Sequence, residues 1–518
     1  MTRRPDPDAS STAMRSPRKH LRHVTVRVLL STLAIAVVAA PFLASWRHDA
    51  ARRAVSAQAA APGSYDQTLA TSLTRADASA PIVLAYHDIN PHPGNRYTLT
   101  PQQLDAQLSA LKAAGYRSLS TEMFIRYLRT GRAPAPRSVY LTFDDGTRGL
   151  WAYADPILAK HRMRAAAYLI TGMVGTHRPY YLSWQEIDRM SSSARWDFQD
   201  HTHRSHSRLA VDSTGRKGST LANRIWLTGP KRLETESEYR SRIRLDLDRS
   251  LRAFREHDLP APQLFAYPYS ETTAPTNLAG RSTSALEELL RDRFTATLTN
   301  TSSRPLPAGP RATLQRQVQR LEVLRTMSQA AFLRRLGEWT SRSPGDPAEP
   351  LAHPDQWQFP DGPQGSDLTA VTGKGLAHGT YASAVHLPLA TADWSTYRVT
   401  ATADRLSGSA TGASIEMGHG SLSPCTLTVS ATGLRVSERP AHGKVRITTR
   451  RLTESSARRI TLRVSPREKR ITVDGTTVVI TADHPVEPAA TSGGLTLAVR
   501  NEAGERPWPR FTTLHISP

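Results

Sequence analysis

The region from residue 81 to residue 336 alternates short apolar runs with amphipathic helical segments, and no other feature of this chain restricts its fold as strongly. The clearest apolar runs are 82–86, 139–143 and 165–170, and a helix begins between the first two at Thr100-Pro101. Such alternation predicts parallel strands joined by crossover helices. We therefore expect a barrel or a doubly wound sheet, with the chemistry at the carboxyl ends of the strands.

The composition changes after this α/β region, which we place at residues 81–340. Residues 341–354 are rich in Ser, Pro and Gly and predict a linker. Beyond it, in residues 355–518, β-rich runs dominate, and Asp474-Gly475 between two of them predicts a hairpin. We expect an all-β sandwich that resembles concanavalin-like jelly rolls. Glycan binding is its preferred role, ahead of a structural role or a second enzymatic activity.

The N-terminal segment combines positive charge with an apolar run. Residues 1–27 are basic, and the uncharged run 28–46 is long enough to cross a bilayer, which takes about 20 residues. The charge before the run orients the rest of the chain outward. An uncleaved anchor is favoured by the length of the run, while small-residue sites near Ala44 and Ala59 leave a cleaved signal, and a secreted protein, open. Residues 47–80 have the composition of a flexible linker.

The charge and cysteine content exclude some kinds of site. The formal net charge is +22, from 67 Lys and Arg against 45 Asp and Glu, but no nucleic-acid-binding motif accompanies the scattered arginines. We therefore expect no nucleic acid partner. Cys425 is the only cysteine, so an intramolecular disulfide is excluded and any metal has to be held by His, Asp or Glu.

Three polar segments follow three of the predicted strands. Residues 142–146 read T-F-D-D-G, residues 200–206 read D-H-T-H-R-S-H after the strand 196–199, and residues 265–270 read F-A-Y-P-Y-S. Each has an ordinary structural explanation by itself, such as an Asp-Gly turn or a surface polar run. Together, a carboxylate and neutral imidazoles make a three-ligand site with open positions, as a catalytic Zn²⁺ requires.

These segments, in this order, resemble the polysaccharide deacetylase family of carbohydrate esterases, which has the NodB homology domain. The likeness covers about half of the chain and implies a distorted (β/α) barrel. It implies that Asp145, His201 and His206 bind Zn²⁺ or another divalent transition metal such as Co²⁺ or Ni²⁺, which lowers the pKa of a water molecule. It also implies that Asp144 is the general base and that the backbone N–H of Tyr269 holds the oxyanion.

The spacing of the histidines departs from the usual family pattern. His201 and His206 are five residues apart, with His203 between them, whereas most members have a spacing of four. This spacing, the pair Tyr86-His87 and the insert 208–236 resemble the branch that deacetylates poly-β-1,6-N-acetylglucosamine.

Two catalytic parts of the family have no counterpart at their usual places. Ala266 stands where many relatives have an Arg that tunes the base, and no late His is available as general acid. The acid is therefore either Asp144, returning its proton, or His87 as the weaker candidate. Ser270 also replaces the Gly that usually follows the oxyanion Tyr.

We therefore expect a membrane-anchored, metal-dependent enzyme that removes N-acetyl groups from an extracellular N-acetylglucosamine polysaccharide. Poly-β-1,6-N-acetylglucosamine is the first candidate and peptidoglycan the second. The alternative from another class is an inactive, glycan-binding surface protein, because an Arg and an acid are missing. Candidates for stacking on sugar rings, with ordinary packing as the alternative, are Tyr180, Tyr181, Trp184, Trp394 and Tyr397.

Overall fold

The computed structural model describes Leu30 and residues 80–518, apart from residues 271–275, 279–280, 361–365, 377–378, 441–442, 483–486, 503 and 505–506. The basic segment 1–27, nearly all of the apolar run 28–46 and the linker 47–79 lie outside the described residues. Among the helices that are described, none combines the length and the apolar character needed to span a bilayer. The membrane anchor stays a prediction.

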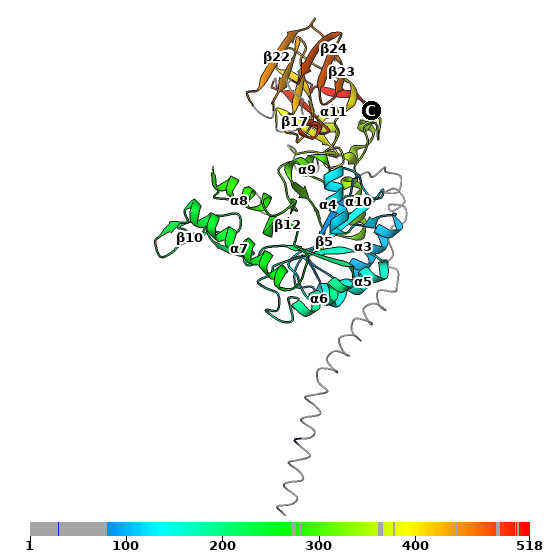
Figure 1. Ribbon diagram of the computed structural model, residues 1–518. Helices are drawn as coiled ribbons and strands as arrows, with labels where there is room; N and C mark the ends of the chain where they lie inside the picture. The colour runs from blue at the N-terminus through cyan, green and yellow to red at the C-terminus, as the bar shows by residue number, and fades with distance from the viewer. Residues whose placement is uncertain are drawn as a thin grey trace, which may run out of the picture. The chain divides into compact units, whose positions relative to one another are not determined.

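The α/β region forms a nearly closed barrel of parallel strands (Figure 1). The strand order is β14 (Gln317–Gln319), β13 (Ala296–Thr299), β12 (Leu264–Ala266), β7 (Trp196–Asp200), β6 (Ala165–Leu169), β5 (Ser138–Phe143), β1 (Ile82–Tyr86) and β15 (Leu321–Glu322), with β4 (Arg117–Ser118) beside β5. The strands at the two ends of this order, β14 and β15, are separated along the chain by Arg320 alone. The two edges of the sheet therefore meet at one residue, which confirms the barrel and excludes the doubly wound sheet.

The helices on the outside of the barrel begin at residues that cap them. Thr100 and Gln103 form a reciprocal capping box at the start of α3 (Pro101–Ala113), and Ser183 and Glu186 form another at α6 (Trp184–Ser192). The segment 150–161 is less regular than a single α-helix, because a π-helical turn (Leu150–Ala154) precedes α5 (Asp155–His161). In Figure 1, α3, α5 and α6 all lie against the outer side of the sheet.

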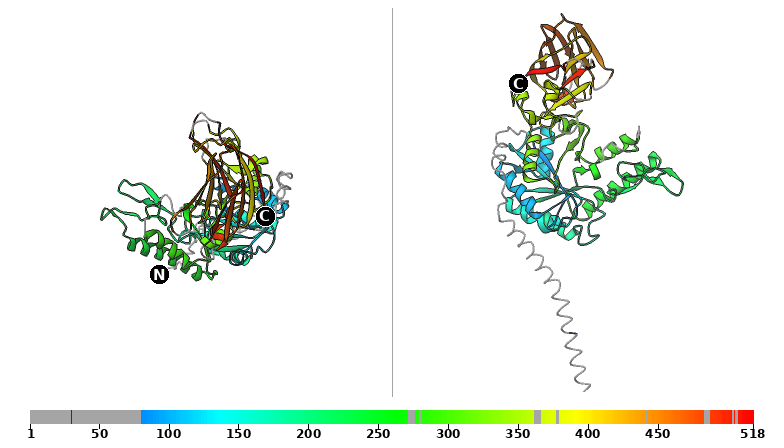
Figure 2. Two further views of the ribbon diagram at one scale, coloured as in Figure 1. Left: turned by 90° about the horizontal axis from the view of Figure 1, so that it is seen from above. Right: turned by 180° about the vertical axis from the view of Figure 1, so that it is seen from behind.

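The insert after β7 contains two short hairpins that the sequence analysis does not foresee. They are formed by β8 (Arg208–Ala210) with β9 (Lys217–Ser219) and by β10 (Trp226–Leu227) with β11 (Arg232–Leu233). The hairpins lead into α7 (Glu236–Glu256), which packs beside α8 (Arg281–Arg291). These elements lie together on one side of the barrel in both views of Figure 2.

The C-terminal part is a sandwich of two antiparallel sheets, as predicted. One sheet has the order β16 (Trp357–Gln358), β17 (Tyr381–His386), β26 (Leu495–Asn501), β19 (Thr411–Met417), β20 (Cys425–Val429), β21 (Gly433–Glu438) and β22 (Arg446–Arg451). The other has β25 (Thr476–Thr481), β24 (Glu468–Val473), β23 (Arg458–Val464), β18 (Tyr397–Asp404) and β27 (Arg510–Ser517). The hairpin at Asp474-Gly475 joins β24 to β25, because Val473 pairs with Thr476.

Two aromatic residues of the sandwich belong to its core. Trp394 is 5% exposed and Tyr397 is 2% exposed, and their ring centroids lie 5.6 Å apart. The Trp394 indole also donates a hydrogen bond to the backbone oxygen of Arg342. Ordinary packing is therefore the role of these two rings rather than a sugar platform, because both are buried.

Candidate active site

The two adjacent carboxylates lie where β5 ends and the chain turns sharply. Asp145 and Gly146 both have left-handed backbone conformations, with φ of 72° and 71°. A Cβ at Gly146 would lie 2.9 Å from the Leu169 side chain, so this turn requires glycine for space as well as for conformation. A left-handed conformation at the non-glycine residue Asp145 costs free energy, and such residues gather at functional sites.

The structure brings Asp145, His201 and His206 together. The Oδ1 atom of Asp145 lies 3.5 Å from Nε2 of His201 and 3.3 Å from Nε2 of His206. One ligand atom from each of the three residues lies within 4.8 Å of the others, which suits a single metal ion. The third histidine of the segment, His203, turns away and contacts the Thr171 hydroxyl at 3.0 Å.

The donor atoms of these residues fit a divalent cation. His201 Nδ1 donates to the backbone oxygen of Ala266 at 2.8 Å, which leaves Nε2 as the lone-pair donor. Asp145 Oδ1 is buried and accepts no hydrogen bond from the described residues. A buried anionic oxygen without a donor, facing two imidazole nitrogens, is the arrangement that a transition metal such as Zn²⁺ completes.

The electrostatics around the two carboxylates favour their ionised forms. Burial raises the pKa of Asp145, but His201 and His206 outweigh it and hold that pKa well below its usual range. Burial likewise raises the pKa of Asp144, but the Arg320 guanidinium, with His201, brings it below the ordinary value. Burial lowers the pKa of His201, and the two carboxylates more than reverse this. The site therefore holds two anionic carboxylates at neutral pH.

Arg320 supplies the guanidinium that the third sequence segment lacks. Its Nη1 and Nη2 donate to Oδ1 and Oδ2 of Asp144 at 2.8 and 2.7 Å, and both side chains are almost fully buried. Arg320 Nε donates to Asn300 Oδ1 at 2.9 Å, and the Asn300 amide donates to Glu322 at 2.8 Å. A bidentate pair of this kind fixes the orientation of the carboxylate as well as its charge. Arg320 is not among the residues predicted from the sequence, because this arginine follows a polar strand outside the three motifs.

The loop after β12 carries Tyr269 and Ser270, both in left-handed conformations, with φ of 58° and 56°. The ring of Tyr269 lies between His206, at a centroid distance of 4.7 Å, and the Arg208 guanidinium, at 4.4 Å. Ser270 Oγ accepts from the backbone N–H of Asn300 at 2.9 Å. This hydrogen bond holds the serine where glycine would adopt the same conformation without strain.

A cleft of about 350 Å³ connects these groups. Its lining includes Asp144, Asp145, both metal-ligand candidates of the 201–206 loop, Tyr269 and Glu322. His87, at the end of β1, also lines the cleft, and its Nδ1 atom is buried without a hydrogen-bond partner among the described residues.

The sugar-stacking candidates differ in their surroundings. Tyr180 lines the cleft and is 47% exposed, whereas the ring of Trp184 stacks on that of His257, with 3.8 Å between the two centroids.

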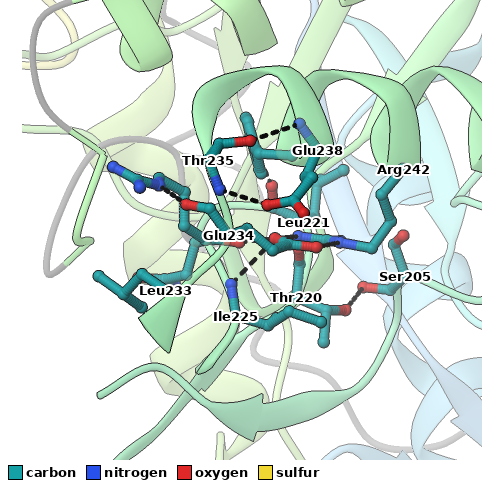
Figure 3. A network of polar contacts seen from close by, with 12 residues as sticks. Ser205, Thr220, Leu221, Ile225, Leu233, Glu234, Thr235, Glu238 and Arg242 are labelled. Atoms are coloured by element: carbon teal, nitrogen blue, oxygen red, sulfur yellow. Dashed lines mark hydrogen bonds and ion pairs between the residues drawn. The ribbon is translucent and has the colours of Figure 1, made fainter. Parts of the chain in front are cut away.

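The helix α7 holds the 200–206 loop through three side chains spaced four residues apart. The first is Arg242, which donates to the backbone oxygen of Thr220 at 2.8 Å, while the Thr220 hydroxyl donates to the backbone oxygen of Ser205 at 2.9 Å. Figure 3 shows this chain of contacts and the carboxylate of Glu234, which binds Arg242 through both oxygens at 2.7 and 2.9 Å. The residue before His206 is thus tied to α7 through the insert.

The other two side chains of α7 act directly on the loop. Asp246 accepts the backbone N–H groups of His203 and Arg204 at 3.0 and 2.8 Å. Ser250 is fully buried and donates to Asp200 at 3.0 Å. The loop between the two ligand histidines is therefore positioned from outside, by a helix that follows it in the sequence.

Part of the chain is similar in sequence to known deacetylases. Residues 131–285 match the family model for "Polysaccharide deacetylase". The "Poly-beta-1,6-N-acetyl-D-glucosamine N-deacetylase" of Escherichia coli (strain K12) is 27% identical over 206 residues, which are 37% of this chain and 30% of that protein. The protein of the same name from Staphylococcus epidermidis is 35% identical over 114 residues, 21% of this chain and 39% of that protein. The chain thus spans well under half the length of these relatives.

Two solved structures are similar at lower identity. A de-N-acetylase from Aggregatibacter actinomycetemcomitans aligns with a TM-score of 0.41 and 18% identity, over 49% of this chain and 98% of that one. The BpsB deacetylase domain from Bordetella bronchiseptica aligns with a TM-score of 0.39 and 22% identity, over 51% of this chain and 98% of that one.

Both His87 and Arg320 lie outside the residues 131–285 that match the family model.

Replacement of Asp246 by Asn should weaken Zn²⁺ binding by about 10- to 100-fold, the usual cost of losing a group that orients a ligand. The amide has one oxygen for two N–H donors, and its NH₂ group would face one of them. Titration of the full chain against a competing chromogenic chelator measures the affinity. Asp248→Asn is the matched control, because Asp248 is on the same helix but binds Arg293. Unchanged affinity in Asp246→Asn would show that α7 does not position the ligands.

Proposed function

Because the chain carries a polysaccharide deacetylase domain, we propose that this domain hydrolyses N-acetyl groups of an extracellular N-acetylglucosamine polymer, with the aid of a divalent metal. The observation that carries the proposal is a single cleft that holds Asp144, paired with Arg320, beside the three candidate ligands Asp145, His201 and His206. Poly-β-1,6-N-acetylglucosamine is the proposed polymer, supported by the names of the curated relatives and by the five-residue histidine spacing.

The proposed chemistry divides between a cation and the residues of the chain. A divalent ion held by Asp145, His201 and His206 would act as a Lewis acid and make Zn²⁺-type hydrolysis possible at neutral pH. Asp144 takes the proton from the attacking water, and Arg320 keeps its carboxylate ionised and aimed. The backbone N–H of Tyr269 stabilises the negative charge that develops on the acetamide oxygen. The products are acetate and a glucosamine unit.

His87 is the proposed general acid. Asp144 is less suited to be the acid, because the Arg320 guanidinium, with one hydrogen bond to each carboxylate oxygen, favours the ionised form that acts as the base. His87 lies in the same cleft, at the end of the strand β1 beside β5, and its ring packs on Tyr97 at 4.9 Å. An imidazole in this position can protonate the nitrogen as the C–N bond breaks.

The alternatives are weaker for specific reasons. The proposal of an inactive glycan-binding protein rests on a missing Arg and a missing acid, yet Arg320 contacts the base and His87 lines the cleft. Peptidoglycan remains the second candidate substrate. The location outside a membrane, with residues 28–46 as the anchor, is proposed from the basic residues that precede an apolar run.

The full chain should release acetate from β-1,6-linked N-acetylglucosamine oligomers when Zn²⁺ is present, and release should stop after chelation. Asp144→Asn should lower kcat by at least about a thousandfold, because general base catalysis is lost while the metal ligands remain. Asp188→Asn, an exposed carboxylate of α6, is the matched control. Acetate is measured by an enzyme-coupled assay. Release from peptidoglycan fragments but not from these oligomers would contradict the proposed substrate.

Replacement of Arg320 by Gln, which removes the positive charge, should move the acidic limb of the kcat/KM profile to higher pH. Arg320 lowers the pKa of Asp144, so the base of the variant is protonated over a wider acidic range and is active only at higher pH. The loss of the two hydrogen bonds that orient the Asp144 carboxylate should also lower kcat by about a hundredfold. Zn²⁺ affinity should stay at the wild-type value, which reports an intact fold. An unshifted acidic limb would contradict the role of Arg320.

A pair of substrates separates a general acid from a merely structural His87. His87→Gln should lower acetate release from the N-acetyl oligomers by about a hundredfold or more, because the amine leaves only when protonated. Hydrolysis of 4-nitrophenyl acetate should change by less than about threefold, because its leaving group needs no proton. His92→Gln, an exposed histidine of the same segment, is the control. Equal losses on both substrates would contradict the assignment.

A further inference from the structure

Three arginines form a row across the outer face of the five-stranded sheet of the sandwich. Arg398 on β18 pairs directly with Arg463 on β23, which pairs with Arg470 on β24. Their neighbours along each strand are buried and the three arginines are exposed, so all three side chains face solvent. Adjacent strands are about 4.8 Å apart, so the row spans about 10 Å. We call these residues the arginine row.

This row is costly for the fold. Like charges directly opposite on neighbouring strands destabilise a sheet. Among the described residues, no hydrogen bond or ion pair engages the side chain of Arg398 or Arg463, and Arg470 has only an exposed contact with Glu468 at 3.0 Å. Such a surface pair contributes little. The row therefore keeps most of its positive charge, and stability does not account for it.

Two other arginines of the same sheet are neutralised, whereas the exposed side chain of Arg459 on β23 has no carboxylate contact among the described residues. Arg510 pairs with Asp404 at 2.8 and 3.1 Å, and Arg458 donates to Asp474 at 2.7 Å. The buried and half-buried arginines of the sheet thus have a carboxylate partner, whereas the exposed arginine row has none beyond Glu468. The positive charge of the row is therefore available to an anion from outside the chain.

A second row runs beside the first. Thr400, Thr461, Thr472 and Thr477 are aligned across four strands, two residues away from the arginine row. Their hydroxyls can donate to and accept from the hydroxyls of a sugar. The face therefore presents a line of guanidinium groups next to a line of hydroxyl groups, which suits a linear partner more than a compact one.

We propose that this face of the sandwich binds a linear anionic polysaccharide, whose carboxylates or phosphates lie on the arginine row and whose hydroxyls contact the threonine row. A single-stranded nucleic acid would need aromatic rings to stack on, and the described outward positions of these strands carry none apart from His515. A membrane surface would favour apolar groups beside the charges, and Val479 stands at the end of the row by itself. The cationic product of the proposed deacetylase would be repelled, so the sandwich holds the enzyme to a different polymer from its substrate.

Binding of the full chain, in neutral detergent, to immobilised polygalacturonate tests this assignment, with dextran and chitosan as the neutral and cationic controls. The variant Arg398→Gln/Arg463→Gln/Arg470→Gln should raise Kd by at least about tenfold and reduce the slope of log K against log salt concentration. The control Arg435→Gln/Arg439→Gln/Arg451→Gln removes the same charge from exposed positions on or beside the other sheet. Its Kd should stay within about twofold of the wild type.

Two further measurements distinguish loss of the binding face from loss of the fold or of the enzyme activity. The melting temperature of the row variant should equal or exceed that of the wild type, because a repulsion is removed, and acetate release from soluble oligomers should be unchanged. Equal weakening in both triple variants would show that net charge alone binds the polymer, and would overturn the proposal. Tighter binding to phosphatidylglycerol vesicles or to single-stranded DNA, lost in the row variant, would also overturn it.

Discussion

The buried contact between Arg320 and Asp144 is the interaction on which the candidate active site depends. Burial of either charge alone would be strongly unfavourable, and each is tolerated because the other satisfies it through two hydrogen bonds. The geometry of the barrel makes the contact possible. Asp144 follows β5, Arg320 precedes β15, and only β1 lies between these strands. The pairing of β15 with β1, which closes the sheet, therefore also brings Arg320 into contact with the proposed base Asp144.

The candidate metal ligands are held by other contacts. They come from the turn after β5 and the loop after β7, and α7 fixes that loop from outside through Arg242, Asp246 and Ser250. Asp246 accepts two backbone N–H groups between the two histidines and so fixes the path of the loop. The two halves of the site share the turn after β5, but their remaining residues come from different elements, Arg320 before β15 and the two histidines after β7.

Much of the barrel and of the ligand set could be predicted from the sequence. Apolar runs mark β1, β5 and β6 almost to the residue, and the local motifs contain Asp145, His201 and His206. The strands are local features that periodicity reveals, whereas the choice of these three residues as metal ligands comes from the family resemblance.

The residues that could not be predicted act through long-range contacts. Arg320 follows the alternating segment Q-V-Q, which is typical of an exposed edge strand, and only closure of the sheet buries it. The sequence gives only an indirect indication of Arg320, since Ala266 stands where many members of the resembled family have the arginine that contacts the base. Ser250 is similar, since its polar side chain suggests the solvent face of α7, yet it is fully buried against Asp200. Sequence patterns describe the faces of an element but not which distant residue they meet.

The position of Arg320 along the chain also sets an order of assembly. A growing polypeptide contains every proposed metal ligand once residue 206 has been made, whereas the guanidinium that compensates Asp144 is added much later. A fragment that ends after Ala266 but before Arg320 would contain the candidate ligands and the groups of α7 and β12 that position them, without the guanidinium that pairs with Asp144. The proposed hydrolysis is thus expected to require the complete barrel, whereas all residues of the candidate metal site precede its last strand in the chain.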